Sequence, residues 1–307
     1  MVLPDGSTLV SERESGQVKR LSSGAATSIG TVPGVAAGGE GGLLGLAVDS
    51  ATFAADPVVY AYLTSASDNR VVAMPYAGGS LGAPRTVLTG IPKSGTHNGG
   101  RLAFGPDGFL YVTTGDAGNR AAAQDRGALG GKILRVTTAG APAPGNPFGD
   151  SPVWSMGHRN VQGIAWDPSG RMWASEFGQD TWDELNVITP GANYGWPTVE
   201  GQAGRAGFVD PVRQWATDDA SPSGIAIGPD GAVLIAALKG QSLWKVPVAA
   251  DGSTGEPQRL LQGEFGRLRD VLVGPDGDIW VVTNNTSRGT PRAGDDRIVR
   301  LPRALTG

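Results

Sequence analysis

A short turn sequence, Pro-Asp-Gly or its variant Pro-Ser-Gly, recurs along the chain between apolar and β-branched residues. Proline presets φ and glycine accepts a positive φ, so each copy favours a tight turn that joins two antiparallel strands. The turn prolines Pro106, Pro168, Pro229 and Pro275 are 62, 61 and 46 residues apart. A fifth copy stands at residues 3–11, and a degraded sixth copy spans residues 46–63. Hairpins repeated at such intervals are typical of the blades of a β-propeller.

A second short strand-like run follows each of the six hairpins. These runs cover residues 17–21, 70–74, 132–136, 184–188, 243–246 and 297–301. Six hairpins and six outer runs predict an all-β fold, a six-bladed β-propeller with four-stranded antiparallel blades. We expect one domain over residues 1–307, with a single helical turn within residues 119–129.

Composition agrees with this fold and excludes several classes of function. Of the 307 residues, 49 are glycine, an excess that fits many tight turns. The net charge of −4 comes without a basic stripe, so we expect no nucleic-acid partner. The sequence has no run of 18 apolar residues, so no membrane span is predicted. Cysteine is absent, which excludes disulfides and thiolate chemistry.

The first hairpin lacks the apolar strand that precedes the other turns, because the chain reaches Leu3-Pro-Asp-Gly at once. We therefore expect that residues upstream of Met1 have been removed, together with an export signal. This predicts an exported protein, whether periplasmic, extracellular or at the cell surface.

Histidine occurs twice, at His97 and His158, and both lie in loops that lead into predicted inner strands. His97 is surrounded by Gly95, Gly99 and Gly100, which would let a ligand approach the backbone closely. Such a histidine can act as a general base at neutral pH. It can equally be a loop histidine that bonds to a neighbouring carbonyl group, and the pattern alone leaves both open.

Four cations, Arg159, Lys239, Arg267 and Arg269, stand at strand entrances or ends in different predicted blades. Arginine binds carboxylates in a bidentate manner, so a convergent set would suit a ligand with several carboxylates. Any one of them can also be ordinary surface charge. Because Arg267 and Arg269 are two apart on an expected strand, they should share a face.

An acidic segment at residues 175–184 concentrates four carboxylates within nine positions around Gly178. Calcium prefers carboxylate and backbone carbonyl oxygens. A calcium site and a solvated acidic turn both fit this composition, and the spacing does not match an EF-hand loop.

Several motifs in one order resemble a known family. They are Gly-Gly-Leu-Leu-Gly45, His97-Asn-Gly-Gly-Arg-Leu102, Thr114-Gly-Asp116, Gly131-Lys-Ile-Leu-Arg135, Gly157-His-Arg-Asn160, Asp183-Glu-Leu-Asn186, Asn193-Tyr-Gly-Trp-Pro197 and Arg267-Leu-Arg-Asp270. Their order over essentially the whole chain is similar to that of the soluble quinoprotein glucose and aldose sugar dehydrogenases. That family is a six-bladed propeller that binds pyrroloquinoline quinone (PQQ) and calcium.

The resemblance implies a set of roles. His97 would take the proton from the sugar C1 hydroxyl as hydride passes to the quinone, giving a lactone, and Arg159 would assist at the quinone carbonyl. The cofactor would be held by residues that the resemblance matches to its contacts: Glu40, Arg159, Asn160, Lys239, Arg267 and Arg269. The carbonyl groups of Gly178 and Gln179 would bind a catalytic calcium ion, and Glu184 with the Tyr194 backbone a second, structural one.

Three positions depart from the family pattern. Glu40 stands where the glucose dehydrogenases have glutamine, Thr96 where they have aspartate, and Gln179 where they have proline. The chain also lacks the long insertions that shape a glucose pocket and a dimer interface, so we expect a monomer acting on a broad range of aldoses with an unknown electron acceptor. Two alternatives stay open: a propeller without cofactor that binds a sugar or a partner, and a calcium-dependent lactonase.

Overall fold

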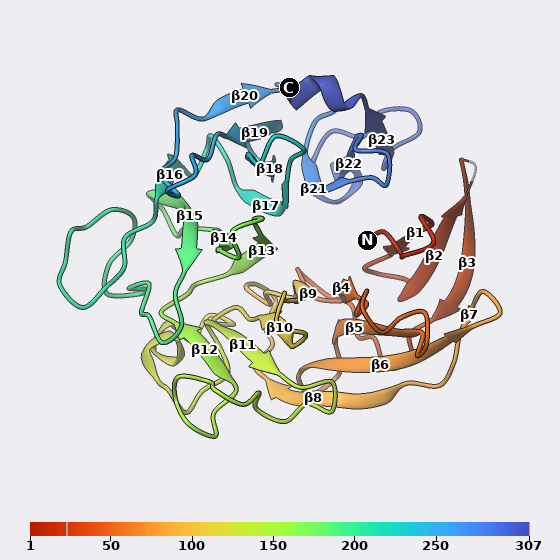
Figure 1. The fold of residues 1–307 in the computed structure, drawn as a ribbon, viewed down its shortest axis with the longest axis horizontal. Coiled ribbons are helices and arrows are strands. Elements are labelled where there is room, and N and C mark those ends of the chain that lie inside the picture. Colours follow the sequence, from red (N-terminus) through yellow and green to blue (C-terminus); the bar gives the residue numbers. More distant parts are fainter. Residues whose placement is uncertain (23, 307) are drawn as a thin grey trace. The chain divides into compact units, whose positions relative to one another are not determined.

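The structure is a computed structural model that describes residues 1–22 and 24–306. Within these residues the chain is mostly β, and its strands form six antiparallel sheets (Figure 1). The fold is a six-bladed β-propeller with mainly four-stranded blades, as the hairpin repeat predicts. The chain divides into two compact units: Met1–Val161 with Pro190–Pro197, and Gln162–Thr189 with Thr198–Gly307. The prediction of one domain over residues 1–307 stays a prediction.

The first unit contains three sheets. The first is β1(Thr8–Ser11), β2(Gln17–Ser22) and β3(Ala25–Thr31). The second is β4(Leu43–Ala47), β5(Val58–Thr64), β6(Asn69–Ala77), β7(Ser80–Leu81) and β8(Arg85–Ile91). The third is β9(Leu102–Phe104), β10(Leu110–Thr113), β11(Lys132–Val136) and β12(Val153–Met156), with the 3₁₀ helix η1(Arg120–Gln124) between β10 and β11.

The second unit also contains three sheets. They are β13(Val161–Trp166), β14(Met172–Glu176), β15(Trp182–Ile188), β16(Arg213–Ala216); then β17(Pro222–Ile227), β18(Val233–Ala237), β19(Ser242–Val246), β20(Gln258–Leu260); then β21(Leu268–Val273), β22(Ile279–Thr283), β23(Ile298–Leu301). The short helix α1(Asn285–Arg288) follows β22, and η2(Arg303–Thr306) ends the described chain. No helix among the described residues is long and apolar enough to cross a membrane.

The predicted turns form as their sequence requires. The glycines of the five clear copies all have a φ near +80°, and each donates its N–H to the carbonyl oxygen three residues earlier: Gly6, Gly108, Gly170, Gly231 and Gly277. Five of the six outer runs lie within strands, the sixth begins one residue before β23, and the predicted helical turn is η1. The number of strands differs from four in three sheets, because two have three strands and one has five.

Alternation along the strands builds a core in each unit. Leu110 and Val112 on β10 pack with Leu134 and Val136 on β11 in the first unit. Ile235 on β18 packs with Trp173 of β14 in the second unit. Burying such side chains contributes roughly 1.5–3 kcal/mol each, so these sheets make rigid supports for the loops that connect them.

Candidate active site

The two histidines lie in the first unit, in different environments. His158 is fully buried, its Nε2 atom lies 2.8 Å from the Ser155 hydroxyl, and its ring stacks on Tyr194. His97 keeps 18% of its side chain exposed, and its Nδ1 lies 2.7 Å from Oδ1 of the buried Asp116. His97 is therefore the histidine that a small molecule can reach, and His158 is a packed core residue.

Asp116 is held as a carboxylate by its surroundings. Burial alone would raise its pKa, but hydrogen bonds from His97, from the Gly118 N–H and from the Trp196 indole keep that pKa below its usual range. A deprotonated Asp116 accepts the Nδ1–H of His97. The ring then carries its lone pair on Nε2, which is the form that accepts a proton.

The backbone of His97 is fixed from both sides. Its φ is +55°, an uncommon value for a residue with a side chain, and its N–H donates to Oε2 of Glu40 over 2.8 Å. Its carbonyl accepts the Ala117 N–H, and a Cβ at Gly115 would lie 1.9 Å from that oxygen. Glu40, assigned to the cofactor by resemblance, thus has a contact with the loop of the histidine.

Asn98 anchors the same loop in the sheet below it. Its Oδ1 accepts the Asn69 side-chain N–H and the Ser94 N–H, and its own carbonyl accepts the Tyr62 hydroxyl. All of these atoms belong to the first unit, and Asn98 is buried. This network explains how a loop residue such as His97 can hold one conformation.

Arg159 and Asn160 follow His158 and lie beside the same aspartate. The Arg159 carbonyl accepts the Asp116 N–H, and its guanidinium lies 5.5 Å from the centre of the Trp196 ring. Asn160 accepts the Gly99 N–H on Oδ1. The structure therefore gathers Glu40, His97, Arg159 and Asn160 around Asp116 and Trp196 in the first unit.

Asp116 and Trp196 are two residues of this site that were not predicted from the sequence. Asp116 ends the Thr114-Gly-Asp116 motif, and Trp196 lies in the Asn193–Pro197 motif, so both stood among the residues of the resemblance. Trp196 is buried, and its indole N–H donates to the carboxylate of Asp116.

The three remaining predicted cations lie in the second unit. Lys239 forms an ion pair with Asp218 in which both side chains are mostly exposed, so a ligand carboxylate can compete for the amine at little cost. Arg269 is half-buried in β21, and Arg267 precedes this strand by one residue. The pairing of β21 with β22 shifts register between Leu268 and Asp270, so simple alternation does not decide the faces of Arg267 and Arg269.

The guanidinium of Arg267 is partly buried and lies near the like charge of Arg288. Its Nε is buried without a hydrogen-bond partner among the described residues. Burial, followed by the charge of Arg288, lowers the pKa of its guanidinium. Such a site fits an anionic ligand, because a carboxylate would satisfy the orphaned donor and screen the two like charges.

The acidic segment folds into a carboxylate-rich turn at the entrance of β15. Asp183 accepts the N–H groups of Gly178 and Ser221, and Glu200 accepts the N–H of Gln179 over 2.5 Å. A side chain at Gly178 would clash with the Trp182 carbonyl at 1.8 Å, so glycine is required there. Glu200 was not predicted from the sequence, because it lies 16 residues beyond the segment.

Glu184 faces a second carboxylate across the sheet. It pairs with Glu176 on β14, and both are buried. Burial, then Glu176, and also Glu200 raise the pKa of Glu184 to about 8. A cation placed among these oxygens would remove that penalty, so the donor set fits calcium.

The structure does not test the two predicted calcium sites, which stay predictions. No group of three or more His, Asp or Glu side chains in the described part of the chain is arranged to hold a metal ion. The catalytic calcium ion was predicted to bind the backbone carbonyl oxygens of Gly178 and Gln179. A site made of backbone oxygens does not need a group of acidic or histidine side chains. Glu184 and Tyr194 belong to different units, so their pairing is not tested.

Comparison with known proteins shows where this chain belongs. Residues 1–290 match the family Glucose / Sorbosone dehydrogenase. The PQQ-bound aldose sugar dehydrogenase of Streptomyces coelicolor is 55% identical, with a TM-score of 0.94 over 98% of this chain and 92% of that one. The apo-form of the soluble aldose sugar dehydrogenase of Escherichia coli is 30% identical, with a TM-score of 0.84 over 92% and 91% of the two chains.

A curated relative agrees with these two structures. The aldose sugar dehydrogenase YliI of Escherichia coli is 31% identical over 93% of this chain and 86% of its own length. The match thus extends over nearly the whole sequence, including the loops that carry His97, Asp116 and Arg267. The chain belongs to the glucose/sorbosone dehydrogenase family.

Proposed function

We propose that this protein is a quinoprotein dehydrogenase that oxidises aldose sugars at C1. The observation that carries the proposal is the reachable His97 ring, oriented by a buried, ionised Asp116. Such a pair is a general base aimed at a hydroxyl proton. The similarity to a PQQ-bound aldose sugar dehydrogenase supports the choice of cofactor and substrate class.

The proton of the sugar C1 hydroxyl passes to Nε2 of His97 while Asp116 accepts the Nδ1–H and stabilises the imidazolium that forms. As the O–H bond breaks, C1 gains a double bond to oxygen and loses its hydrogen with two electrons, which gives a lactone. PQQ, when bound, supplies the acceptor for that hydride.

The other residues of the site bind and orient. The Arg159 guanidinium, 5.5 Å from the centre of the Trp196 ring, would supply positive charge at the quinone carbonyl, where negative charge develops as the hydride is accepted. Arg267, Arg269 and Lys239 provide cations for the three carboxylates of PQQ. Trp196 and the Gly118 N–H hold Asp116 in place and keep it ionised.

Calcium, the cellular location and the oligomeric state are further parts of this proposal. The carbonyls of Gly178 and Gln179 are proposed to bind one calcium ion, and Glu184 with the Tyr194 carbonyl a second. We also propose a monomer that is exported. Gel filtration and fractionation of the native host test these two points, and a dimer or a cytoplasmic pool would contradict them.

Reconstitution tests the proposed function directly. Purified protein with PQQ and Ca²⁺ should reduce a redox dye when an aldose is added, and a panel of sugars gives the specificity. His97→Asn should bind PQQ as the wild type does but lose at least roughly 10³-fold in activity, because asparagine tolerates the positive φ yet cannot take the proton. A wild type that binds no PQQ, or oxidises no sugar, would refute the proposal.

A further inference from the structure

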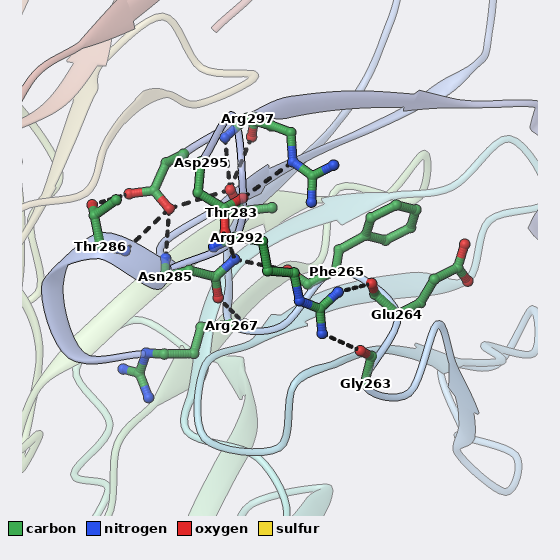
Figure 2. A network of polar contacts seen from close by, with 11 residues as sticks. Gly263, Glu264, Phe265, Arg267, Thr283, Asn285, Thr286, Arg292, Asp295 and Arg297 are labelled. Carbon is green, nitrogen blue, oxygen red and sulfur yellow. Dashed lines mark hydrogen bonds and ion pairs between the residues drawn. The ribbon is translucent and has the colours of Figure 1, made fainter. Parts of the chain in front are cut away.

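Three arginines surround the loop that follows β22, and they differ in what they contact (Figure 2). Arg297 donates through Nε to Asp295, and Arg292 donates to the carbonyl oxygens of Gly263 and Glu264. In Figure 2 the Arg267 side chain extends away from Asp295, and no dashed line reaches its guanidinium. Arg292 and Arg297 therefore stabilise the loop, whereas the guanidinium of Arg267 does not take part in these contacts.

Asn285 fixes the backbone on both sides of Gly266. Its Oδ1 accepts the Arg267 N–H over 2.9 Å, and its Nδ2 donates to the Phe265 carbonyl over 2.9 Å. The Asn284 N–H donates to the Arg267 carbonyl, so both polar groups of the Arg267 backbone are bonded to this loop. Asn285 is 2% exposed, which makes these bonds hard for water to replace.

The approach is so close that it requires glycine at position 266. A Cβ there would lie 2.3 Å from Oδ1 of Asn285, and the φ of Gly266 is +73°. Gly289 is likewise in contact with the side chain of Arg267, since a Cβ there would lie 2.9 Å from Cδ. The polypeptide on both sides thus limits where the Arg267 side chain can go.

Two carboxylates hold Asn285 in turn. Asp295 accepts the Asn285 Nδ2–H over 3.0 Å and the Arg292 N–H over 2.7 Å. Asp296 accepts the Asn285 N–H over 2.5 Å and also bonds to Thr286. The loop is closed on itself by its own acids, so its contacts with Arg267 do not depend on a ligand.

We propose that Asn285 is a positioning residue that fixes the backbone of Arg267, so that the guanidinium is presented to a carboxylate of the anionic cofactor. This inference rests on the proposed function. Bidentate recognition of a carboxylate depends on the position and plane of the guanidinium, and a long side chain on a mobile backbone would lose affinity to entropy.

The experiment measures PQQ affinity of the apo-protein by fluorescence quenching, with thermal melting of each variant to report folding. Asn285→Ala should weaken PQQ binding by roughly 10- to 100-fold, the range expected for a disturbed charged hydrogen bond. Gly266→Ala should do the same, because it displaces the intact Asn285 side chain. If Asn285→Ala does not fold, Asn285→Ser takes its place and should also weaken PQQ binding, because one short hydroxyl cannot bond to both Arg267 and Phe265.

Arg292→Ala and Thr286→Ala are the matched controls, since both loosen the same loop without touching Arg267. They should keep PQQ affinity within about 2-fold of the wild type even where they lower the melting temperature. The decisive measurement repeats Asn285→Ala in an Arg267→Ala background, where it should have no further effect on PQQ affinity.

The outcomes separate the two proposals. A wild type that does not bind PQQ overturns the proposed function and this inference with it. A wild type that binds PQQ, with Asn285→Ala and Gly266→Ala unchanged in affinity, overturns only the role of Asn285. An equal loss from Asn285→Ala with and without Arg267 also overturns it, because the effect would then not pass through Arg267.

Discussion

The imidazole of His97 and the carboxylate of Asp116 meet at 2.7 Å, and the carboxylate is completely buried while the ring is not. The aspartate is further held by the indole of Trp196 at 2.8 Å. The buried partner therefore orients the ring, and the partly exposed ring is the side chain that a substrate can reach.

Asp116→Asn should lower kcat by roughly 10²- to 10⁴-fold. The asparagine can present its N–H to Nδ1 and so favour the wrong tautomer, while PQQ affinity stays close to that of the wild type. Steady-state kinetics with a quinone titration check this. Asp125→Asn, which changes a carboxylate of the same loop with no contact to His97, should keep its kcat.

Gly115→Ala should reduce activity, because the new side chain would displace the backbone of His97. The new methyl group would meet the His97 carbonyl oxygen at 1.9 Å and the side-chain oxygen of Asn160 at 3.0 Å, which leaves it no room. We expect a fall in both kcat and melting temperature, with destabilisation on the order of 2 kcal/mol or more. Gly145→Ala, a positive-φ glycine with open space around it, should change stability through φ alone and leave kcat intact.

Glu184 should make the calcium-free protein less stable as pH rises. Its pKa is about 8 in the folded chain against the ordinary value of 4.5, so the folded state binds more protons between these values and stability falls from pH 4.5 to 8. Glu184→Gln should remove this slope, on the order of 2–4 kcal/mol over the window. Thermal or urea unfolding in a chelator measures it.

The exposed Glu264→Gln is the control for that series and should keep the wild-type slope. Added Ca²⁺ at pH 8 should stabilise the wild type more than Glu184→Gln. A wild-type stability that does not fall between pH 5 and 8 would contradict the assignment of a buried, proton-retaining Glu184.

Lys132→Met should destabilise the protein by about 2–4 kcal/mol near neutral pH. The Lys132 ammonium is fully buried and donates to the carbonyl oxygens of Ala122, Ala123 and Gly130, which would lose their donor. Lys93→Met removes a single carbonyl contact, to Ser65, and should cost less than about 1 kcal/mol. Urea unfolding compares the two.

The difference in stability between the wild type and Lys132→Met should also depend on pH, because the pKa of Lys132 differs between the folded and unfolded chain. Burial lowers the pKa of Lys132 to about 8, below the ordinary value of 10.5, so the unfolded chain binds more protons between these values. Wild-type stability relative to Lys132→Met should therefore rise from pH 8 to 10. A constant difference would indicate that the amine is not desolvated.

The fold could be read from the sequence because the turn chemistry is local. Proline and glycine at Pro106 and Gly108 specify the turn by themselves, and the alternation of apolar residues on β10 and β11 gives the faces. The number of strands per sheet was less predictable, because β7 has only two residues, Ser80 and Leu81, and pairs with the end of β6 across a tight turn, which is too short for an alternating pattern to be seen in the sequence.

The site was only partly predictable for a related reason. His97 was found because histidine is rare here and lies among glycines, but its partners Glu40 and Asp116 are 57 and 19 residues away and meet it only in the folded unit. Asp and Glu are common, so no local pattern selects these two. Asn285 had no signal at all, since its side chain bonds to the backbone of Arg267 and Phe265, which are 18 and 20 residues away.

The left-handed backbone of His97 has a practical consequence for engineering. A directed-evolution library that randomises residues 94–100 would mostly sample chains unable to adopt this conformation, and would return inactive clones regardless of sugar. Diversity is better placed at residues 119–121, which are exposed, with Gly118 kept because its N–H donates to Asp116. New sugar preferences should be sought there, with the histidine loop left untouched.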